Sequence, residues 1–455
     1  MPIHYLSTNR VRKTLLQVSY LLSFFVIMVA TLLILASSPK PSFEKSTNIS
    51  PEQIREIQNL VLNTFTNITS SSEIHTFSLN SNASNLVLRY LLNIMPATKS
   101  SQIQINFHNE QASLEASIPI VLDLLGLEFP TFFFNIYSVI SPSINKNSSF
   151  EISSVRIGSI PIPNWALQIG LSAAGKTLNS HNLDTKALSK RVKLVSIEPE
   201  AFQISLVWEP DFLETLSAQA QTLFIPTQSQ PRLLHYSDLI NKVINDLPSD
   251  RRAISVNALL VPLASSAYQR SINGADPISE NRALLSAIAA YANDTFELQL
   301  EELGKNQEVQ QKIEVRLHKR QDLAQHVTSA AAITAYFGSP VAEMISNTKE
   351  IYDARFGSGF SFSDLTANTV GIKLASLMTE TPAQALAMQL RLSEIKSELD
   401  YMPFVGSNTD GIREEEFTNI YQDRDGKQYL QKISEITDLI DSLALFSKQK
   451  EAAKD

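Results

Sequence analysis

The chain has 455 residues, a net charge of −8, 44% hydrophobic residues and 18% charged residues, values typical of a folded protein rather than a disordered one. It contains no cysteine, which excludes disulfides, thiolate catalysis, zinc ribbons and iron–sulfur clusters. The first forty residues carry four basic residues and no acid, so the remainder carries −12. Such an acidic remainder is a poor binder of nucleic acid, because phosphate contacts need a basic face.

An uncharged apolar run extends from residue 15 to residue 36. At about 1.5 Å per residue, a helix of this length crosses the ~30 Å hydrocarbon core of a membrane. Arg10, Arg12 and Lys13 precede the run, and the positive-inside rule therefore predicts a cytoplasmic N-terminus. The alternative is a cleaved signal peptide, but the apolar region of such a peptide usually has only ~7–15 residues.

We therefore predict a cytoplasmic N-terminus over residues 1–14, a transmembrane anchor over 15–37 and a short spacer over 38–50. A large extracytoplasmic part without any disulfide is more typical of a Gram-negative periplasm than of a eukaryotic cell surface. The sequence thus predicts a single-pass protein of a bacterial inner membrane, with the bulk of the chain in the periplasm.

Residues 51–225 are expected to form an α+β domain with a mostly antiparallel sheet. Helices are predicted from Pro51 and over residues 84–95. A very aromatic stretch, residues 118–140 around Phe132, is expected to be buried or to line an apolar groove. Apolar residues alternate with polar ones, as in strands, at Ile103, Ile105, Phe107, Leu114, Ala116, Phe150, Ile152, Val155, Ile157, Phe202, Ile204, Leu206 and Trp208.

Residues 233–455 are expected to form an all-α domain. Asp276 and Pro277 have the pattern of an N-cap followed by the first helical residue. The DRDGK segment, residues 423–427, is interpreted as a turn, because a calcium loop around it would lack acids at both ends. Other helices are predicted over 235–245, over 256–271 or only from near Pro262 to 271, and over 277–291, 383–399 and 429–447, with a polar linker between the last two.

Polar residues concentrate between residues 320 and 376, where the sequence predicts three helices. Small residues, among them Gly371 in the third helix, would let these helices approach closely. Ser363 is expected to cap the third helix. The side chains expected to meet are Asp322, His326 and Ser329 from the first helix, Lys349, Glu350 and Asp353 from the second, and Asp364 and Asn368 from the third.

Three interpretations of this cluster stay open. The favoured one is a buried polar network that fixes the register of the helices. The second is a hydrolase or transferase site, with His326 as general base and Glu350 or Asp353 orienting it. The third is a site for a hard cation, held by the same three residues and Asp364. Since no nucleophile elbow or metal signature is present, the sequence assigns neither a metal nor a cofactor.

The cluster resembles the YfiM-type periplasmic protein family and, more distantly, the VanZ-like membrane family. This chain departs from the former in lacking a lipidated cysteine and in placing the pattern, residues 320–376, inside a longer protein. The IGSIPIP stretch, residues 157–163, resembles the YpmS-type single-anchor envelope proteins, and the whole layout resembles long proteobacterial envelope proteins. These resemblances imply an envelope location and no agreed reaction. The residues that match the YfiM-type pattern are Asp322, His326, Ser329, Lys349, Glu350, Asp353, Gly357, Gly359, Ser361, Asp364, Asn368 and Gly371.

We predict a non-enzymatic envelope protein that binds an apolar ligand, an envelope lipid or another envelope protein through the α+β domain. The alternative is a hydrolase or transferase that acts on envelope lipid or glycan through His326, Glu350 and Asp353. The two differ in whether the cluster opens to a cleft or lies sealed with every polar group paired.

Overall fold

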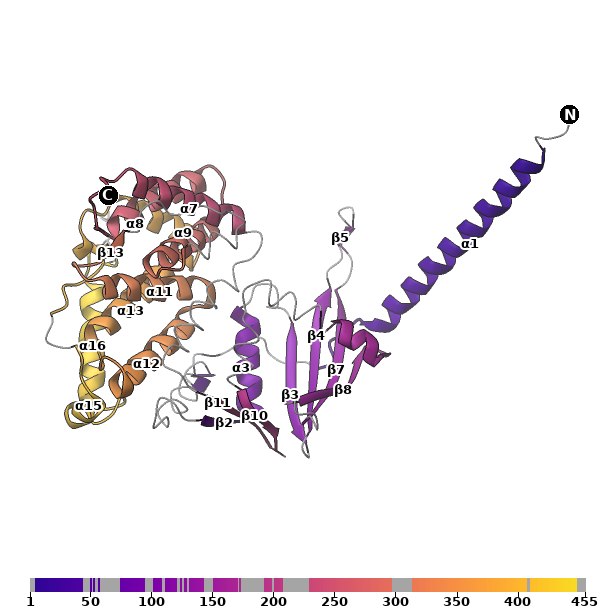
Figure 1. The fold of residues 1–455 in the computed structure, drawn as a ribbon, viewed down its shortest axis with the longest axis horizontal. Helices are drawn as coiled ribbons and strands as arrows, with labels where there is room; N and C mark the ends of the chain where they lie inside the picture. Colours follow the sequence, from indigo (N-terminus) through magenta and orange to yellow (C-terminus); the bar gives the residue numbers. More distant parts are fainter. Residues whose placement is uncertain are drawn as a thin grey trace, which may run out of the picture. The chain divides into compact units, whose positions relative to one another are not determined.

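The computed structural model mixes helices with antiparallel sheet, which confirms an α+β chain with a helical C-terminal part (Figure 1). Its contacts divide the chain into two compact units, one made of Met1–Gln53, Thr76–Lys176 and Val192–Leu206, and a second made of Ile54–His75, Thr177–Arg191 and Val207–Asp455. The structure describes residues 5–43, 50, 52–53, 56–57, 74–94, 101–108, 111–120, 123–124, 127–128, 131–142, 150–170, 172, 192–198, 200–207, 229–296, 313–406 and 410–447.

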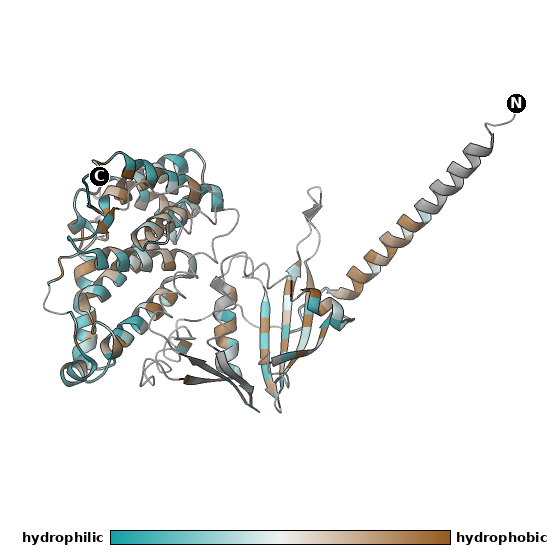
Figure 2. Ribbon diagram, in the orientation of Figure 1, coloured by the Kyte–Doolittle hydropathy of each residue, from teal (hydrophilic) through white to brown (hydrophobic). Residues whose placement is uncertain are grey.

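The first unit begins with one long helix, α1 (Tyr5–Ala36). Its window Ser19–Ala36 is strongly hydrophobic (Figure 2), with a mean hydropathy of 2.4. None of this window is buried. By length and composition, α1 is the one helix among the described residues that could cross a membrane. It begins ten residues before the apolar run, because the preceding polar and basic residues are helical as well.

The main sheet of this unit has the order β3-β4-β7-β8-β9, with β1 paired to β7, and every pairing is antiparallel. The predicted alternating positions therefore lie in strands wherever the structure describes them, whereas Trp208 and most of the helix from Pro51 lie outside the described residues. The strands are β1 (Ser37–Ser38), β3 (Gln102–His108), β4 (Gln111–Ile120), β7 (Phe132–Pro142), β8 (Phe150–Ile157) and β9 (Ile160–Ile162).

Helix α3 (Ser81–Ile94) protects an edge of this sheet. Strand β3 ends the strand order, so its backbone would otherwise offer free hydrogen-bonding groups. The side chain of Asn85 donates to the carbonyl of Ile105 and accepts from its N–H, both at 2.8 Å. A smaller sheet has the order β10-β11-β2, formed by Val192–Ile197, Ala201–Val207 and Ile74–Asn80, and a short hairpin joins β5 (Asp123–Leu124) to β6 (Leu127–Glu128).

From residue 229 onward, the part of the second unit that the structure describes is helical, apart from two short parallel strands and two isolated bridges. Its largest core runs through α9, in which every residue from Ala283 to Ala292 is buried. The elements are α7 (Gln230–Asn245), β12 (Ala253–Ser255), α8 (Asn257–Ile272), α9 (Pro277–Ala292), β13 (Glu314–Arg316), α11 (Gln321–Phe337), α12 (Ser339–Phe356), α13 (Phe362–Thr379), α14 (Pro382–Glu394), a 3₁₀ turn (Glu398–Asp400), α15 (Glu414–Tyr421) and α16 (Lys427–Asp441).

Capping was predicted correctly at one helix and incorrectly at another. Asp276 caps α9 as expected, because its carboxylate accepts from the N–H of Ser279 at 2.9 Å. Helix α13 is capped by Ser361 rather than Ser363, since the Ser361 hydroxyl accepts from the N–H of Asp364 at 3.0 Å and Ser363 already lies inside the helix.

The expected polar linker contains a helix that the sequence did not predict. Helix α15 has only eight residues, with three acids in its first turn and one buried residue, Phe417, so its apolar stripe is short. Phe417 packs among Phe360, Tyr421 and Tyr429, with ring centroids 4.9–5.6 Å away. The segment after it, residues 423–426, forms the predicted turn.

Candidate functional site

Helices α11, α12 and α13 bring the predicted polar residues together. The contact between α11 and α13 is close at Gly371, where an added Cβ atom would lie 2.2 Å from the carbonyl oxygen of Val327. Because no side chain separates the helices there, His326 on α11 faces Asp364 and Asn368 on α13. The expectation that small residues permit this approach is confirmed.

Three side chains converge, one from each helix: His326, Glu350 and Asp364. Each offers a potential metal-ligand atom, and these atoms all lie within 4.8 Å of one another. Nε2 of His326 lies 3.5 Å from Oδ2 of Asp364. On its other side, Nδ1 of His326 lies 3.1 Å from Oδ1 of Asn368. We call His326, Glu350 and Asp364 the central triad.

The triad is nearly sealed from solvent. The side chains of His326 and Asp364 are 13% and 14% exposed, and Glu350 is 1% exposed. Oε2 of Glu350 accepts from the N–H of Ser361 at 3.0 Å. Oε1 of Glu350, Oδ1 of Asp364 and Nδ2 of Asn368 are buried without a hydrogen-bond partner among the described residues. The cluster is therefore closed but not fully paired, which distinguishes it from a completed structural network.

Acidic groups outnumber basic groups around the triad. Arg320 donates to Asp322 and Asp410, and one of its nitrogens lies 3.7 Å from Asp364, too far for a hydrogen bond. Lys349 donates to Asp353 at 2.7 Å. The two permanent cations are thus engaged mainly by three other carboxylates. Asp364 has only the long 3.7 Å ion pair with Arg320, and Glu350 forms no ion pair among the described residues.

Burial shifts the proton affinity of all three triad residues. Loss of solvent lowers the pKa of His326, so the imidazole is neutral near pH 7. Loss of solvent, with the nearby charge of Asp364, raises the pKa of Glu350 to about 8. Burial also raises the pKa of Asp364. Both carboxyl groups are therefore held near one another at a cost to their ionised forms.

A second buried glutamate in the same unit shows what a satisfied network looks like. Glu280 on α9 is fully buried and accepts hydrogen bonds from Arg232, Arg270 and Tyr236 at 2.6–3.2 Å. Burial opposes its ionisation, but the bonds from Arg270 and Tyr236 outweigh it and lower the pKa. Glu280 is a paired structural ion, whereas Glu350 lacks both a cationic partner and a donor for one oxygen.

The hydrogen bonding of the triad is incomplete between His326 and Asp364. With the Nδ1 proton donated to Asn368, the neutral ring of His326 presents the lone pair of Nε2 toward Asp364. Two lone pairs that face each other at 3.5 Å need a proton or a cation between them. The site can therefore hold a small positive species, and its burial leaves little room for anything larger.

The predicted site residues divide into three groups. His326, Glu350, Asp364 and Asn368 meet in the centre. Asp322 lies at the rim, where it pairs with Arg320, and the side chain of Asp322 is 47% exposed. Asp353 pairs with Lys349 and therefore does not orient His326. Ser329 is half-buried and takes no part in the hydrogen bonds that the described residues of the cluster form.

Two contributors, Arg320 and Asp410, were not identified from the sequence. Arg320 directly precedes α11, and Asp410 lies in the polar linker, where it accepts from the Ser361 hydroxyl at 2.8 Å. The only sequence sign of Arg320 is its place two residues before Asp322, and nothing in the spacing indicates Asp410. Tertiary folding alone brings Asp410 to the N-terminus of α13.

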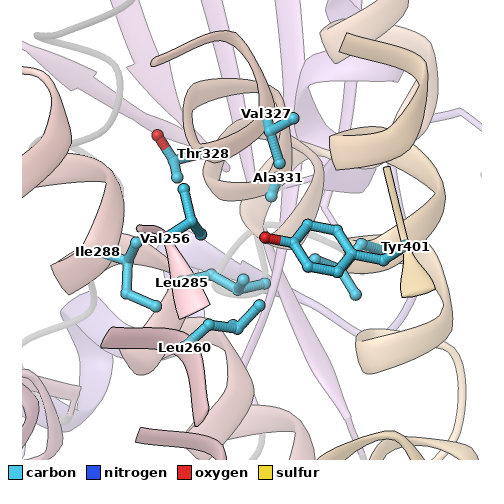
Figure 3. Close-up of a pocket in the computed structure, with 9 residues that line it drawn as sticks. Val256, Leu260, Leu285, Ile288, Val327, Thr328, Ala331 and Tyr401 are labelled. Carbon is cyan, nitrogen blue, oxygen red and sulfur yellow. The ribbon is translucent and has the colours of Figure 1, made fainter. Parts of the chain in front are cut away.

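A cavity in the same unit does not provide a ligand site. It measures about 10 Å³, and its lining is largely apolar, including Leu260, Val327 and Tyr401 (Figure 3). A space of this size holds roughly one water molecule. The Tyr401 hydroxyl donates to Asn257 at 2.9 Å, so the cavity is a packing gap in the core.

Comparison of the chain with protein-family models, with curated proteins and with solved structures finds no match. The resemblances to the YfiM-type, VanZ-like and YpmS-type families therefore stay predictions.

Proposed function

We propose that the chain is a membrane-anchored protein whose helical unit binds one divalent metal ion through His326, Glu350 and Asp364. The observation that carries this proposal is the 1% exposed carboxylate of Glu350, one oxygen of which has no hydrogen-bond partner among the described residues. This carboxylate lies beside a histidine and an aspartate that face each other at 3.5 Å. A cation among them would satisfy both carboxylates and the Nε2 lone pair. Asn368 would act as the outer partner that orients the histidine ring, as is usual for histidine ligands.

The ligand set favours an ion of the zinc or manganese type. One imidazole nitrogen suits zinc and iron, carboxylate oxygens suit manganese and magnesium, and the chain has no thiolate for a softer ion. Ligand atoms around a tetrahedral ion with ~2.0–2.1 Å bonds lie roughly 3.4 Å apart. The histidine–aspartate separation of 3.5 Å already fits, and the most distant pair, within 4.8 Å, would close by at most about 1.4 Å on binding.

The burial of the triad weighs against the hydrolase or transferase alternative. A substrate must reach the base and the acid that act on it, and Glu350 is almost inaccessible. Asp353, the other residue expected to orient His326, binds Lys349 instead. The absence of full pairing likewise weighs against a network that only fixes helix register.

The proposed location follows the amino-terminal sequence. The length and apolar composition of α1 support a membrane anchor, and the basic residues before the apolar run support a cytoplasmic N-terminus. We place the protein in a bacterial inner membrane, with the part of the first unit that follows α1 and the whole second unit on the periplasmic side. Binding of an apolar ligand, an envelope lipid or another envelope protein by the α+β unit remains part of this proposal.

Calorimetric titration of the metal-free, full-length protein in detergent with Zn²⁺ and with Mn²⁺ tests the metal site. We expect one tight site per chain in the wild type, and at least a tenfold loss of affinity in His326→Ala, since removing a ligand costs ~1.4 kcal/mol or more. His235→Ala is the matched control, because His235 lies in the same unit and bonds only the Ser266 hydroxyl in this structure. Equal affinity in wild type and His326→Ala, or no binding at all, would reject the proposal.

A further inference from the structure

The end of α1 is joined directly to the main sheet. Ser37 and Ser38 continue from the helix as β1 and pair with Phe134 and Phe133 of β7. The N–H of Ser159, in the turn between β8 and β9, donates to the carbonyl of Leu35 at 2.9 Å. Part of the segment expected to be a spacer is therefore built into the sheet.

Gly158 makes this junction possible. Its φ is +55°, and a Cβ atom there would lie 2.5 Å from the carbonyl oxygen of Leu35 and 2.7 Å from that of Ala36. A residue with a side chain would push the β8–β9 turn away from the helix end. The IGSIPIP stretch is thus a hairpin that turns at Gly158 and Ser159.

The chain just beyond β1 is also fixed to the sheet. The N–H of Ser42 donates to Ser117 and to Asn135, at 3.0 and 3.1 Å, and the Asn135 amide donates to the carbonyl of Lys40 at 3.1 Å. The hairpin and the strands around it are therefore held in a fixed position relative to the C-terminal end of α1.

A short helix, residues 164–170, follows β9 and carries an exposed apolar face. Figure 1 shows it, in magenta, beside the sheet end of α1. Trp165 and Ile169 are four residues apart, hence on one face, and are 69% and 63% exposed. No charged residue occurs from Ile157 to Gly175. Large apolar side chains grouped on an uncharged surface are typical of an interaction site.

We infer that residues 164–170 form a lipid contact, with Trp165 and Ile169 inserted at the interface of the bilayer that α1 crosses. The apolar window of α1 ends at Ala36, and the Gly158 turn is held against this same end, so the short helix lies at the level of the lipid headgroups. Tryptophan is enriched at that level because its ring is apolar and its N–H is polar. The inference rests on the proposed membrane anchorage, and it adds a second contact that sets the sheet at the membrane surface.

The test uses Trp165 as its own probe. The chain has two tryptophans, so Trp208→Phe leaves Trp165 as the only one. This full-length variant is reconstituted into phosphatidylethanolamine–phosphatidylglycerol vesicles that contain lipids brominated near the carbonyl end of the acyl chain. We expect blue-shifted emission, strong quenching by the brominated lipid and weak quenching by aqueous iodide. Iodide quenching as strong as for free tryptophan, with none by brominated lipid, would overturn the inference.

Two further variants and one extraction make the result specific. In the Trp208→Phe background, Ile169→Asp should lower the quenching by brominated lipid by about a half, because a charge opposes insertion of the same face. Ile272→Asp, an exposed apolar position of the helical unit, should leave it unchanged. Alkaline carbonate extraction separates the two proposals: release of the wild type from the vesicles rejects the anchor itself, whereas retention with a water-exposed Trp165 rejects only the lipid contact.

Discussion

The two buried glutamates of the helical unit have opposite electrostatic settings. Glu280 has Arg232, Arg270 and Tyr236 as donors, and these lower its pKa despite burial. Glu350 receives one backbone N–H, and burial raises its pKa to about 8. In the unfolded chain both titrate near 4.5. The native fold is therefore stabilised by ionised Glu280 and destabilised by ionised Glu350.

Replacing each glutamate by glutamine should reveal this difference in the metal-free protein. Protonated Glu350 contributes stability that is fully present below pH 4.5. As the pH rises through about 8, Glu350 ionises in the folded state and this stability is lost, which lowers the free energy of unfolding by on the order of 3–5 kcal/mol. Glu350→Gln should therefore gain stability relative to wild type as the pH rises. Glu280→Gln should lose stability at neutral pH, because it removes a buried anion from two arginines.

Urea unfolding of both variants at about pH 6 and about pH 9 measures these differences. A Glu350→Gln variant that is equally destabilised at both pH values would show that the carboxylate of Glu350 is a paired structural group. Chelator in all samples keeps bound metal from adding its own stabilisation.

Asn368 is expected to control metal affinity without touching the ion. Its Oδ1 lies 3.1 Å from Nδ1 of His326 and thereby fixes the ring. Loss of such an outer partner typically lowers metal affinity by about 10–100-fold. Asn368→Ala should show this loss in the Zn²⁺ titration, while Asp322→Asn, a change at the exposed rim, should stay within about twofold of wild type. Equal losses in the two variants would contradict a positioning role for Asn368.

The sequence predicted most residues of the cluster but not their pairing. Helical spacing placed His326, Asp364 and Asn368 on facing stripes, because this depends only on the 3.6-residue period. Lys349 and Asp353 are four residues apart on α12, so they could satisfy each other within the helix, and they do. The contribution of Asp410 depends on the tertiary path of the linker, which no local pattern determines.

At the scale of elements, the contact between α11 and α13 positions the site. A Cβ atom at position 371 would lie 2.2 Å from the Val327 carbonyl, so Gly371→Ala should force the two helices apart. We expect a loss of on the order of 1–3 kcal/mol and a melting temperature lowered by several degrees. Gly406→Ala is the control, since a Cβ atom there meets no described atom within 4 Å. Unchanged stability in Gly371→Ala would mean that the helices are not in close contact.

Helices with strong periodicity were predicted, and those without it were missed. Two of the predicted helices end earlier than expected, at Glu394 instead of residue 399 and at Asp441 instead of residue 447. Helix α8 begins at Asn257 and contains Pro262, a residue whose backbone disfavours a helix interior and obscured the true start. Helix α15 has only eight residues and buries only Phe417, so its apolar stripe is too short to distinguish it from a linker. The cap of α13 was misplaced by two residues because Ser361 and Ser363 are both suitable caps by residue type.

At the scale of the whole molecule, the membrane anchor and the basic residues before it together predict the membrane topology. The absence of cysteine lets single cysteines report location without a background signal. In a Gram-negative host, Ser447→Cys should react with a membrane-impermeant maleimide once the outer membrane is opened, whereas Ser7→Cys should react only after the inner membrane is lysed. The reverse pattern would place the helical unit in the cytoplasm and contradict the proposed orientation.

The most direct test of the metal site is X-ray absorption spectroscopy of the zinc-loaded, full-length protein. We predict one zinc per chain with nitrogen and oxygen ligands at about 2.0–2.1 Å, and the scattering signature of one imidazole, lost in His326→Ala. Zinc that is not retained, or an imidazole signature that persists in His326→Ala, would contradict metal binding by His326, Glu350 and Asp364.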